Sequence, residues 1–265
     1  MEQDTSKSLR RAFAILDCFS YDTPELGVRQ IARKINFSPS TTGRLLQAMK
    51  HLGVLRQNPM THSYSLGAKV LYWAGVYSAG LDVRQKALPV MLELQRLTME
   101  TISLYVLEGD ERVCVERLES PQSVRIIARI GRRLPLYAGS AGKVFLAFLP
   151  VERRDQILHR TQLVPLTPST IVDPAVLQME IEKIRRQGYG VSHGEWIADA
   201  AGVSAPVFDA GGEIAAALTI SGPIQRFTQE NVSKYVSLVV EGAKKISFEL
   251  GYQSEAQASV LQKVG

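Results

Sequence analysis

The chain has 265 residues, of which 45% are hydrophobic and 22% are charged, a balance typical of a soluble globular protein and not of a disordered one. Its length favours two domains, because a domain usually holds about 100–200 residues. The formal net charge of +5 is confined to the first third: residues 1–80 hold ten Lys or Arg and five Asp or Glu, whereas residues 81–265 hold 21 of each.

Several classes of protein are disfavoured by what the sequence lacks. No apolar run approaches the ~18 residues of a membrane span, and the first residues lack the apolar core of a signal peptide. Two cysteines, Cys18 and Cys114, are expected in different domains and unpaired, as is typical of a reducing compartment. Four scattered histidines predict no metal site. We therefore expect a cytoplasmic protein without a cofactor.

A one-sided charge block lies between Glu25 and Asp82, where no Asp or Glu occurs. The same stretch contains Arg29, Arg33, Lys34, Arg44, Lys50, Arg56 and Lys69. A polyanion such as DNA binds a surface of this kind with release of counterions. Charge alone leaves open the other interpretation, a solvated basic face that has no ligand.

Two helices are predicted at the start of this block. Over residues 8–20 an apolar side recurs at helical spacing, with a serine cap before it and two arginines near its exposed start. The apolar residues are Leu9, Phe13, Leu16 and Phe19, and the arginines are Arg10 and Arg11. A second, shorter apolar stripe covers residues 28–35, and Asn36-Phe37 ends it.

A third helix is predicted to begin at Ser38-Pro39, because serine accepts an amide hydrogen bond as a cap and proline fits the first helical position. Its expected core face is Leu45, Leu46, Met49 and Leu52, and its expected outer face is Ser40, Arg44, Gln47 and His51, flanked by Thr41. A short helix, a tight turn and a capped polar helix form a helix-turn-helix. Arginine and glutamine can bind guanine and adenine edges through two hydrogen bonds.

The segment after this helix alternates on both sides of the turn Asn58-Pro59-Met60-Thr61, which predicts a β-hairpin that forms a wing. The residues expected to contact DNA are Arg10, Arg11, Arg29, Ser38, Ser40, Thr41, Thr42, Arg44, Gln47, Lys50 and Arg56. The competing interpretation is a plain three-helix domain that packs on the rest of the chain, which leaves the missing acids unexplained.

Residues 68–77 predict a connecting helix that is rich in apolar and aromatic side chains, including Leu71, Trp73, Val76 and Tyr77. Such a helix is expected to pack either on a second protomer or on its own winged domain. A further helix is expected near residues 82–100, with Leu88, Leu92, Leu94 and Leu97 on its core face.

The neutral remainder predicts an α+β domain with a mostly antiparallel sheet. Strands are expected over residues 101–118 as a hairpin with one buried face, and over 123–130, 190–193, 203–208 and 214–221. A loop over 131–143 leads into a helix at 141–148, and helices follow near 151–159, 174–187 and 228–250. We expect residues 254–265 to form a flexible tail.

An enzymatic interpretation of this domain has weak support. Gly139-Ser-Ala-Gly142-Lys143 lacks the glycine spacing of a phosphate-binding loop and the hydroxyl residue after its lysine. No nucleophile motif occurs, and Glu195 and Asp199 are the only close acid pair considered. We expect no catalytic residues.

Three stretches carry a resemblance to a known family. They are Leu134-Pro-Leu-Tyr-Ala-Gly-Ser-Ala-Gly-Lys143, Thr219-Ile-Ser-Gly-Pro223, and the spaced set Gly188, Ser192, Glu195, Val203, Ser204, Val207, Phe208 and Asp209. From about Leu9 to Tyr252 the chain resembles the IclR family of bacterial transcriptional regulators. One position departs from the signature: Gly202 stands where Cys, Ser or Ala is usual, which leaves room beside the effector.

This resemblance implies a winged helix-turn-helix domain (1–67), a linker helix (68–80) and a GAF-like effector-binding domain (81–253), acting as a homodimer or a dimer of dimers. It implies a small carboxylate or aromatic-acid effector. The implied pocket has Ile126 and Leu134 on its apolar side with Ser123 near them, backbone N–H groups of Ser140 and Ala141, and a polar wall of Ser192, Gly202, Thr219 and Ser221. The residues alone favour simpler explanations: a helix cap for Ser140, and ordinary strand alternation for Thr219 and Ser221.

The function we expect is sequence-specific binding to operator DNA, modulated by a small organic acid. The alternative is a ligand-sensing interaction protein whose basic domain binds an acidic protein partner.

Overall fold

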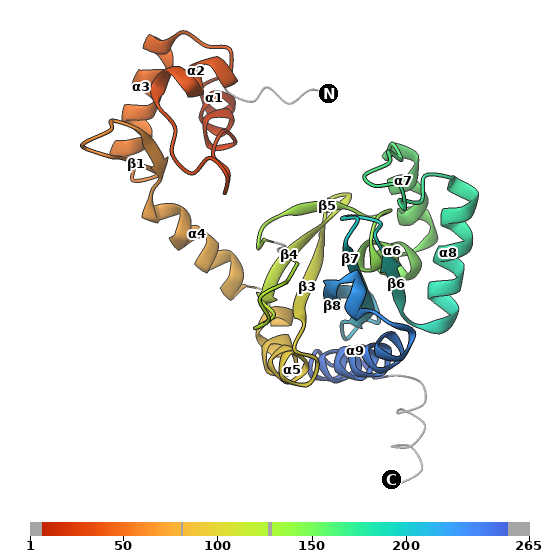
Figure 1. Cartoon of the computed structure of the whole chain (residues 1–265). Helices are drawn as coiled ribbons and strands as arrows, with labels where there is room; N and C mark the ends of the chain where they lie inside the picture. Colours follow the sequence, from red (N-terminus) through yellow and green to blue (C-terminus); the bar gives the residue numbers. More distant parts are fainter. Residues whose placement is uncertain (1–6, 81, 127–128, 254–265) are drawn as a thin grey trace. The chain divides into compact units, whose positions relative to one another are not determined.

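The computed structural model describes residues 7–80, 82–126 and 129–253 (Figure 1). The chain divides into two compact units, residues 1–80 and 81–265. Each unit has its own buried core, so each is described by itself.

The first unit contains four helices and a small hairpin in its described part. These are α1 (Lys7–Leu16), α2 (Val28–Lys34), α3 (Pro39–His51), β1 (Leu55–Gln57), β2 (Tyr64–Leu66) and α4 (Ala68–Ala79). Their core includes Ile15, Ile31, Leu46 and Tyr64, each at most 1% exposed. The antiparallel pair β1–β2, with Arg56 opposite Ser65, is the predicted wing.

The start of α3 follows the predicted capping pattern. Ser38 has extended backbone angles, and its hydroxyl accepts the amide N–H of Thr41 at 3.2 Å. Pro39 occupies the first helical position, where no N–H partner is required. The helix ends at His51, and Gly53 follows with φ +76°, a left-handed conformation that favours glycine. Ser38 and Pro39 therefore fix where α3, the predicted DNA-recognition helix, begins.

Three apolar side chains that the periodicity assigned to the core of the first unit are exposed instead. Leu9 is 49% exposed, Phe13 is 58% exposed, and Leu52 is 63% exposed. Helix α1 ends at Leu16 and buries Ile15, so its core face is rotated from the predicted one. Leu52 is the residue that caps α3, beyond the last turn that packs on the core.

The second unit is built on one six-stranded antiparallel sheet in the order β5-β4-β3-β8-β7-β6. The strands are β3 (Thr101–Glu108), β4 (Glu111–Leu118), β5 (Arg133–Pro135), β6 (Gly190–His193), β7 (Ala200–Phe208) and β8 (Ile214–Pro223). The helices are α5 (Asp82–Thr98), α6 (Ser140–Phe148), α7 (Val151–Arg160), α8 (Pro174–Gln187) and α9 (Gln229–Glu249), and a 3-10 turn covers Ile224–Arg226. This α+β arrangement confirms the predicted fold class.

Both faces of the sheet are buried. Helices α5 and α9 pack together on one face, over residues such as Leu104 and Val113, and α6 and α8 lie on the other, over Tyr105 and Cys114 (Figure 1). The prediction that the β3–β4 hairpin has one buried face was therefore wrong. A register shift between Leu104 and Tyr105 interrupts the alternation on β3.

Two predicted elements of this unit differ from the structure. Residues 123–126 and 129–130 form no strand, and the rest of the predicted 123–130 strand lies outside the described residues. The strand at this edge is β5, inside the stretch expected to be a loop, and Leu134 of β5 is paired with Arg112 of β4. Helix α5 buries Leu94 as predicted, but Leu92 and Leu97 are 51% and 39% exposed, and Ala87 and Met91 are buried instead.

Candidate nucleic-acid interface and effector cavity

The outer face of α3 presents polar side chains to solvent. Ser40, Arg44, Gln47 and Lys50 are exposed, and Thr41 is half-buried beside them. Within the described chain the Arg44 guanidinium has no hydrogen-bond or ion-pair partner. A free guanidinium retains all its donors, in a planar fork that matches the acceptor pair on guanine. Arg44 is therefore the α3 side chain best suited to contact a base edge.

Gln47 and Lys50 connect α3 to the wing. The Gln47 side-chain nitrogen donates to the Tyr64 hydroxyl at 2.8 Å, and Lys50 Nζ donates to Gln57 Oε1 at 3.1 Å. One of its two amide N–H groups is occupied in this way, and the other N–H and the carbonyl oxygen remain available to a ligand. The expectation that Gln47 binds adenine through two hydrogen bonds therefore stays a prediction. Its role here is to hold the wing against the recognition helix.

One predicted DNA contact is buried. Thr42 is 0% exposed, because it lies one turn before Leu46 on the side of α3 that faces the core. Its hydroxyl has no hydrogen-bond partner in the described structure. The prediction that Thr42 contacts DNA is therefore wrong.

Replacing Thr42 with valine, which has nearly the same shape, tests this correction. We expect the variant to bind DNA within about twofold of the wild type and to be at least as stable, because a buried hydroxyl without a partner costs about 1–3 kcal/mol. Fluorescence anisotropy and urea denaturation measure the two quantities. A loss of DNA affinity without a loss of stability would show that Thr42 reaches the duplex after all.

The remaining predicted DNA contacts lie around α3. Arg10 and Arg29 are exposed on α1 and α2. Arg11 is half-buried, with its guanidinium carbon 5.0 Å from the centre of the Phe37 ring. Arg56 is exposed on β1, and its Nε donates to Ser65 across the hairpin at 2.8 Å, which fixes the direction of its side chain. The hydroxyl of Ser38 is occupied by Thr41, so its contribution to DNA binding is limited to the cap.

The second unit holds a cavity of about 70 Å³ beside the start of α6. All but one of the predicted effector residues line it, namely Ile126, Leu134, Ser140, Ala141, Ser192, Gly202, Thr219 and Ser221. Ser123 is exposed and does not line the cavity, because no strand carries it there. The prediction for Ser123 is not met in this structure.

Hydroxyl groups form a connected chain along one wall. Ser140 Oγ and Ser204 Oγ are 2.8 Å apart, and Ser204 Oγ and Thr219 Oγ1 are also 2.8 Å apart. The amide N–H of Ser140 donates to Ser192 Oγ at 3.0 Å. It was predicted to bind the effector, but in this structure it is already occupied. The amide of Ala141 has no acceptor among the residues described, which leaves it available at the start of α6.

The sequence did not single out Tyr105, Arg112 or Trp196, which also line the cavity. Arg112 is 3% exposed, and burial lowers the pKa of its guanidinium to about 10, against the attraction of Tyr105 and Glu195. It is therefore still a cation at neutral pH. Burial also raises the pKa of the neighbouring Cys114 thiol to about 11, so that thiol stays protonated. Alternation along β4 places Arg112 on the same strand face as Cys114, but it does not show that α6 and the cavity lie against that face.

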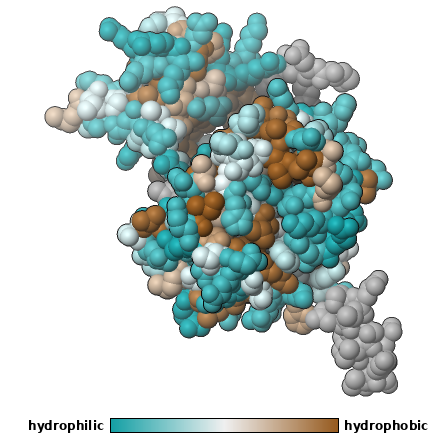
Figure 2. Space-filling view, turned by 45° about the vertical axis from the view of Figure 1, so that its right-hand side comes forward, coloured by the Kyte–Doolittle hydropathy of each residue, from teal (hydrophilic) through white to brown (hydrophobic). Residues whose placement is uncertain are grey.

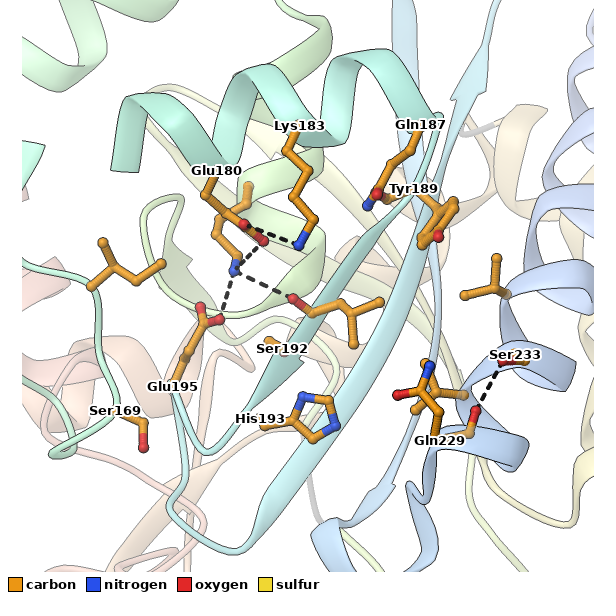
Figure 3. Close-up of a pocket in the computed structure, with 15 residues that line it drawn as sticks. Ser169, Glu180, Lys183, Gln187, Tyr189, Ser192, His193, Glu195, Gln229 and Ser233 are labelled. Atoms are coloured by element: carbon orange, nitrogen blue, oxygen red, sulfur yellow. Dashed lines mark hydrogen bonds and ion pairs between the residues drawn. The ribbon is translucent and has the colours of Figure 1, made fainter. Parts of the chain in front are cut away.

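A buried lysine connects the cavity to α8. Lys143, 1% exposed, donates to Glu195 Oε1 at 2.6 Å, to Glu180 Oε1 at 3.4 Å and to the Val191 carbonyl at 3.3 Å. Glu180 and Glu195 approach each other from α8 and from the segment after β6 (Figure 3). The other oxygen of Glu195 accepts the Gly139 amide at 3.0 Å. Glu195 therefore holds the start of α6, which is a structural role.

A second hollow of about 690 Å³ shares Ser192 and Glu195 with the cavity (Figure 3). Lys143 lines this hollow, but all three of its N–H donors are occupied, so its ammonium is not available to a ligand there. Over the ranges 7–80, 82–126 and 129–253, no group of three or more His, Cys, Asp or Glu is arranged to hold a metal ion. No helix in those ranges is long and apolar enough to span a bilayer.

Comparisons with known proteins cover both units. Residues 8–59 match the IclR helix-turn-helix domain, and residues 76–248 match the family described as "Bacterial transcriptional regulator IclR C-terminal". The chain is 34% identical over 251 residues to the HTH-type transcriptional regulator KdgR of Escherichia coli (strain K12), covering 95% of each protein.

Two solved structures share the whole architecture. One is the IclR of Thermotoga maritima, with a TM-score of 0.79 and 31% identity, covering 94% of this chain and 100% of that one. The other is an IclR homolog from Microbacterium hydrocarbonoxydans complexed with 4-hydroxybenzoate, with a TM-score of 0.81 and 30% identity, covering 92% and 99%.

The two family matches extend over the capped helix α3, the first strand of the wing and the six-stranded unit described above. The relatives are transcriptional regulators, so the chain is a DNA-binding regulator and not an enzyme. It belongs to the IclR family of bacterial transcriptional regulators.

Proposed function

We propose that the protein binds a specific operator through the outer face of α3 and the wing, and that a small carboxylate or aromatic acid in the α6 cavity changes its operator affinity. The observation that carries the first part is the free, exposed guanidinium of Arg44 on a capped helix. No acidic residue occurs between Glu25 and Asp82 to oppose the phosphates. The exposed cations on α1, α2 and β1 can contact the DNA backbone.

Fluorescence anisotropy with the promoter upstream of the protein's own gene tests this proposal. The control is a scrambled duplex of the same length and composition. Operator binding should exceed scrambled binding by about 10³-fold or more, and both should weaken as salt rises because counterions are released. Equal affinity for the two duplexes would contradict the proposal. If the natural partner of the basic domain were an acidic protein, the domain would still bind DNA in a salt-sensitive way, but it would not prefer one DNA sequence over the other.

Homodimer formation through α4 is part of the proposal. Its side chains Leu71, Tyr72, Trp73, Val76 and Tyr77 are between 46% and 77% exposed. None of the five belongs to the buried core of the first unit or to the apolar side chains packed against that core, which favours the second protomer as their partner. On the face shown in Figure 2, hydrophobic residues reach the surface between hydrophilic ones. A recognition helix pair on one duplex needs such a dimer to bind two half-sites.

Replacing Leu71, which is 77% exposed, with glutamate is expected to weaken the dimer by at least about tenfold, because the charge loses water when the apolar faces meet. Sedimentation velocity over a concentration series measures the change. Met60 to glutamate is the matched control, since Met60 is 86% exposed on the wing turn. Unchanged sedimentation of the Leu71 variant would place the dimer interface elsewhere.

Coupling between effector and DNA requires the effector to bind one arrangement of the protein better than another. The segment 131–143 supports this coupling, because it forms β5, one cavity wall and the first turn of α6. An effector that orders this segment can change how the connecting helices separate the paired winged domains.

Gly202 provides a test of the cavity. A Cβ at this position would lie 3.1 Å from Ser140 Oγ and 3.7 Å from Ser221 Cβ. We expect Gly202 to alanine to fold normally and to lower effector affinity by about tenfold, as one methyl group in a tight pocket does. Calorimetry with pyruvate and 4-hydroxybenzoate measures this. Gly75 to alanine, which adds a methyl group in open space, is the control. Unchanged affinity in the Gly202 variant would place the effector outside this cavity.

A further inference from the structure

Arg112 is a buried cation without a carboxylate partner. It lies on β4, and one of its terminal nitrogens donates to the carbonyl of Pro135. Its Cζ lies 5.5 Å from the centre of the Tyr105 ring. Its Nε has no hydrogen-bond partner, and Arg112 forms no ion pair within the described part of the chain. Burying an ion without a counter-ion costs several kcal/mol in a protein interior.

The start of α6 is shaped around this guanidinium. A Cβ on Gly142 would lie 2.3 Å from Arg112 Nη1 and 2.3 Å from the Leu136 carbonyl oxygen. A Cβ on Gly139 would lie 3.2 Å from Arg112 Nη2. Glycine at these two positions therefore lets the guanidinium approach the amino end of a nine-residue helix. Two groups that favour an anion, the helix start and the guanidinium, meet at one cavity.

The nearest acidic residue does not neutralise Arg112. Glu195 lines the cavity, but its two oxygens bind Lys143 Nζ at 2.6 Å and the Gly139 amide at 3.0 Å. Lys143 also pairs with Glu180, which pairs with Lys183 at 3.7 Å, so the two lysines and two glutamates together carry no net charge. The positive charge of Arg112 therefore remains without a direct counter-ion. Among the described residues neither Arg112 Nη2 nor the Ala141 amide has a hydrogen-bond acceptor, so both can donate to a ligand in the cavity that their residues line.

We propose that Arg112 determines effector specificity by binding the effector's carboxylate, together with the Ala141 amide, and that the effector is a short-chain acid. This inference rests on the proposed function, because it names the ligand chemistry of the same cavity. The size limit comes from the cavity, whose volume of about 70 Å³ is far below the ~300–1,000 Å³ of pockets for drug-sized ligands. The apolar side chains of Leu134 and Ile126 then contact the few carbons of the acid.

Matched pairs of acid and amide test the role of the charge. The probes are acetate and acetamide, pyruvate and pyruvamide, and benzoate and benzamide, measured by calorimetry on the full-length protein. In each pair the shape is nearly constant and the negative charge is removed. We expect the wild type to bind pyruvate at least about tenfold more tightly than pyruvamide, and to bind pyruvate more tightly than benzoate, since about 1.4 kcal/mol corresponds to a tenfold ratio.

Two variants at the same position separate charge from shape. Arg112→Gln should lower the affinity for pyruvate by at least about tenfold and bring the acid-to-amide ratio close to one, whereas Arg112→Lys should keep part of the ratio because it keeps the charge. Arg154→Gln is the control, because Arg154 is also buried but is partnered by Asp155 at 2.9 Å and lies on α7. Melting curves confirm folding. If the Gln variant does not fold, the Lys variant carries the test by a reduced ratio.

The outcomes distinguish this inference from the proposed function. The role of Arg112 is overturned if the Arg112→Gln variant still binds the acid more tightly than the amide. It is also overturned if the ratio of the two affinities in Arg112→Lys equals that of the wild type. Absence of binding by all three acids, or tighter binding of benzoate, overturns the short-acid assignment. If Arg112 controls acid binding but the acid leaves operator affinity unchanged, the inference stands and the effector part of the proposed function fails.

Discussion

Replacing Arg44 with alanine is expected to weaken operator binding by about 5- to 160-fold, which corresponds to about 1–3 kcal/mol, and to leave binding to a scrambled duplex much less affected. The reason is geometric. Arg44 is exposed on α3 and forms no hydrogen bond or ion pair within the described residues, so its guanidinium can donate two hydrogen bonds to one base. Fluorescence anisotropy with both duplexes at one salt concentration measures the two affinities.

Two comparison variants sharpen this prediction. Lys50 to alanine should weaken binding to the operator and to the scrambled duplex together, because an exposed ammonium contacts phosphate. The slope of the logarithm of the binding constant against the logarithm of the salt concentration should become smaller in magnitude by about one. Arg185 to alanine, an exposed arginine on α8 of the other unit, should change neither affinity. An Arg44 variant that loses operator and scrambled affinity equally would show that this side chain contacts phosphate and not a base.

Removing the Lys143 ammonium is expected to destabilise the second unit by about 3–5 kcal/mol, because Glu195 is then left buried with its charge unpaired. Lys143 is 1% exposed, and Glu195 is 7% exposed. The Gly139 amide donates to the same Glu195, so an unpaired Glu195 that turns toward solvent would also leave this amide without its acceptor and loosen the start of α6. Urea denaturation of Lys143 to alanine measures the free energy of unfolding. In a Trp73 to phenylalanine background, Trp196 is the only tryptophan left and reports on this unit.

The neighbouring Lys183 is a matched control. It lies on α8, its side chain is 60% exposed, and it pairs with Glu180 at 3.7 Å. Alanine at this position should cost less than about 1 kcal/mol, as exposed ion pairs do. The double replacement of Lys143 by methionine and Glu195 by glutamine should recover most of the loss, because it removes both charges. If Lys143 to alanine lowers the unfolding free energy by less than the Lys183 control, the buried pair is not formed in solution.

Local signals explain which parts of the fold could be predicted from the sequence. Ser38-Pro39 fixes the start of α3 through one hydrogen bond and one missing donor, both of which are properties of adjacent residues. The same holds for Asp173-Pro174, where the aspartate accepts the amides of Ala175 and Val176. Elements of this kind are predictable because their cause is close in the sequence.

Long-range packing explains the failures. The buried face of α5 depends on which side α9 covers: of the predicted leucines Leu94 is buried, whereas Leu92 and Leu97 are exposed, and Ala87 and Met91 are buried in their place. Thr42 is buried because α2 packs against α3, and its residue type suggested exposure. Burial of the second sheet face depends on α6 and α8, which are distant in the chain from β3 and β4.

The effector cavity also contains residues that could be predicted from the sequence and residues that depend on long-range packing. Most residues carried over from the family resemblance line it, because the resemblance contains long-range information that periodicity lacks. Arg112 was missed because only the fold brings β4 against the first turn of α6, where Gly139 and Gly142 leave space for the guanidinium. Ser123 was misplaced because residues 123–126 form no strand.

A selection experiment measures most directly whether the outer face of α3 contacts bases in DNA. Duplexes with a randomised centre are enriched in parallel with the wild-type protein and with the Arg44 to alanine variant, and the bound pools are sequenced. We predict that the wild type selects a two-fold repeated motif, and that the variant loses its preference at one base position in each half-site while keeping the others. Identical motifs from the two proteins, or no motif from the wild type, would contradict the account.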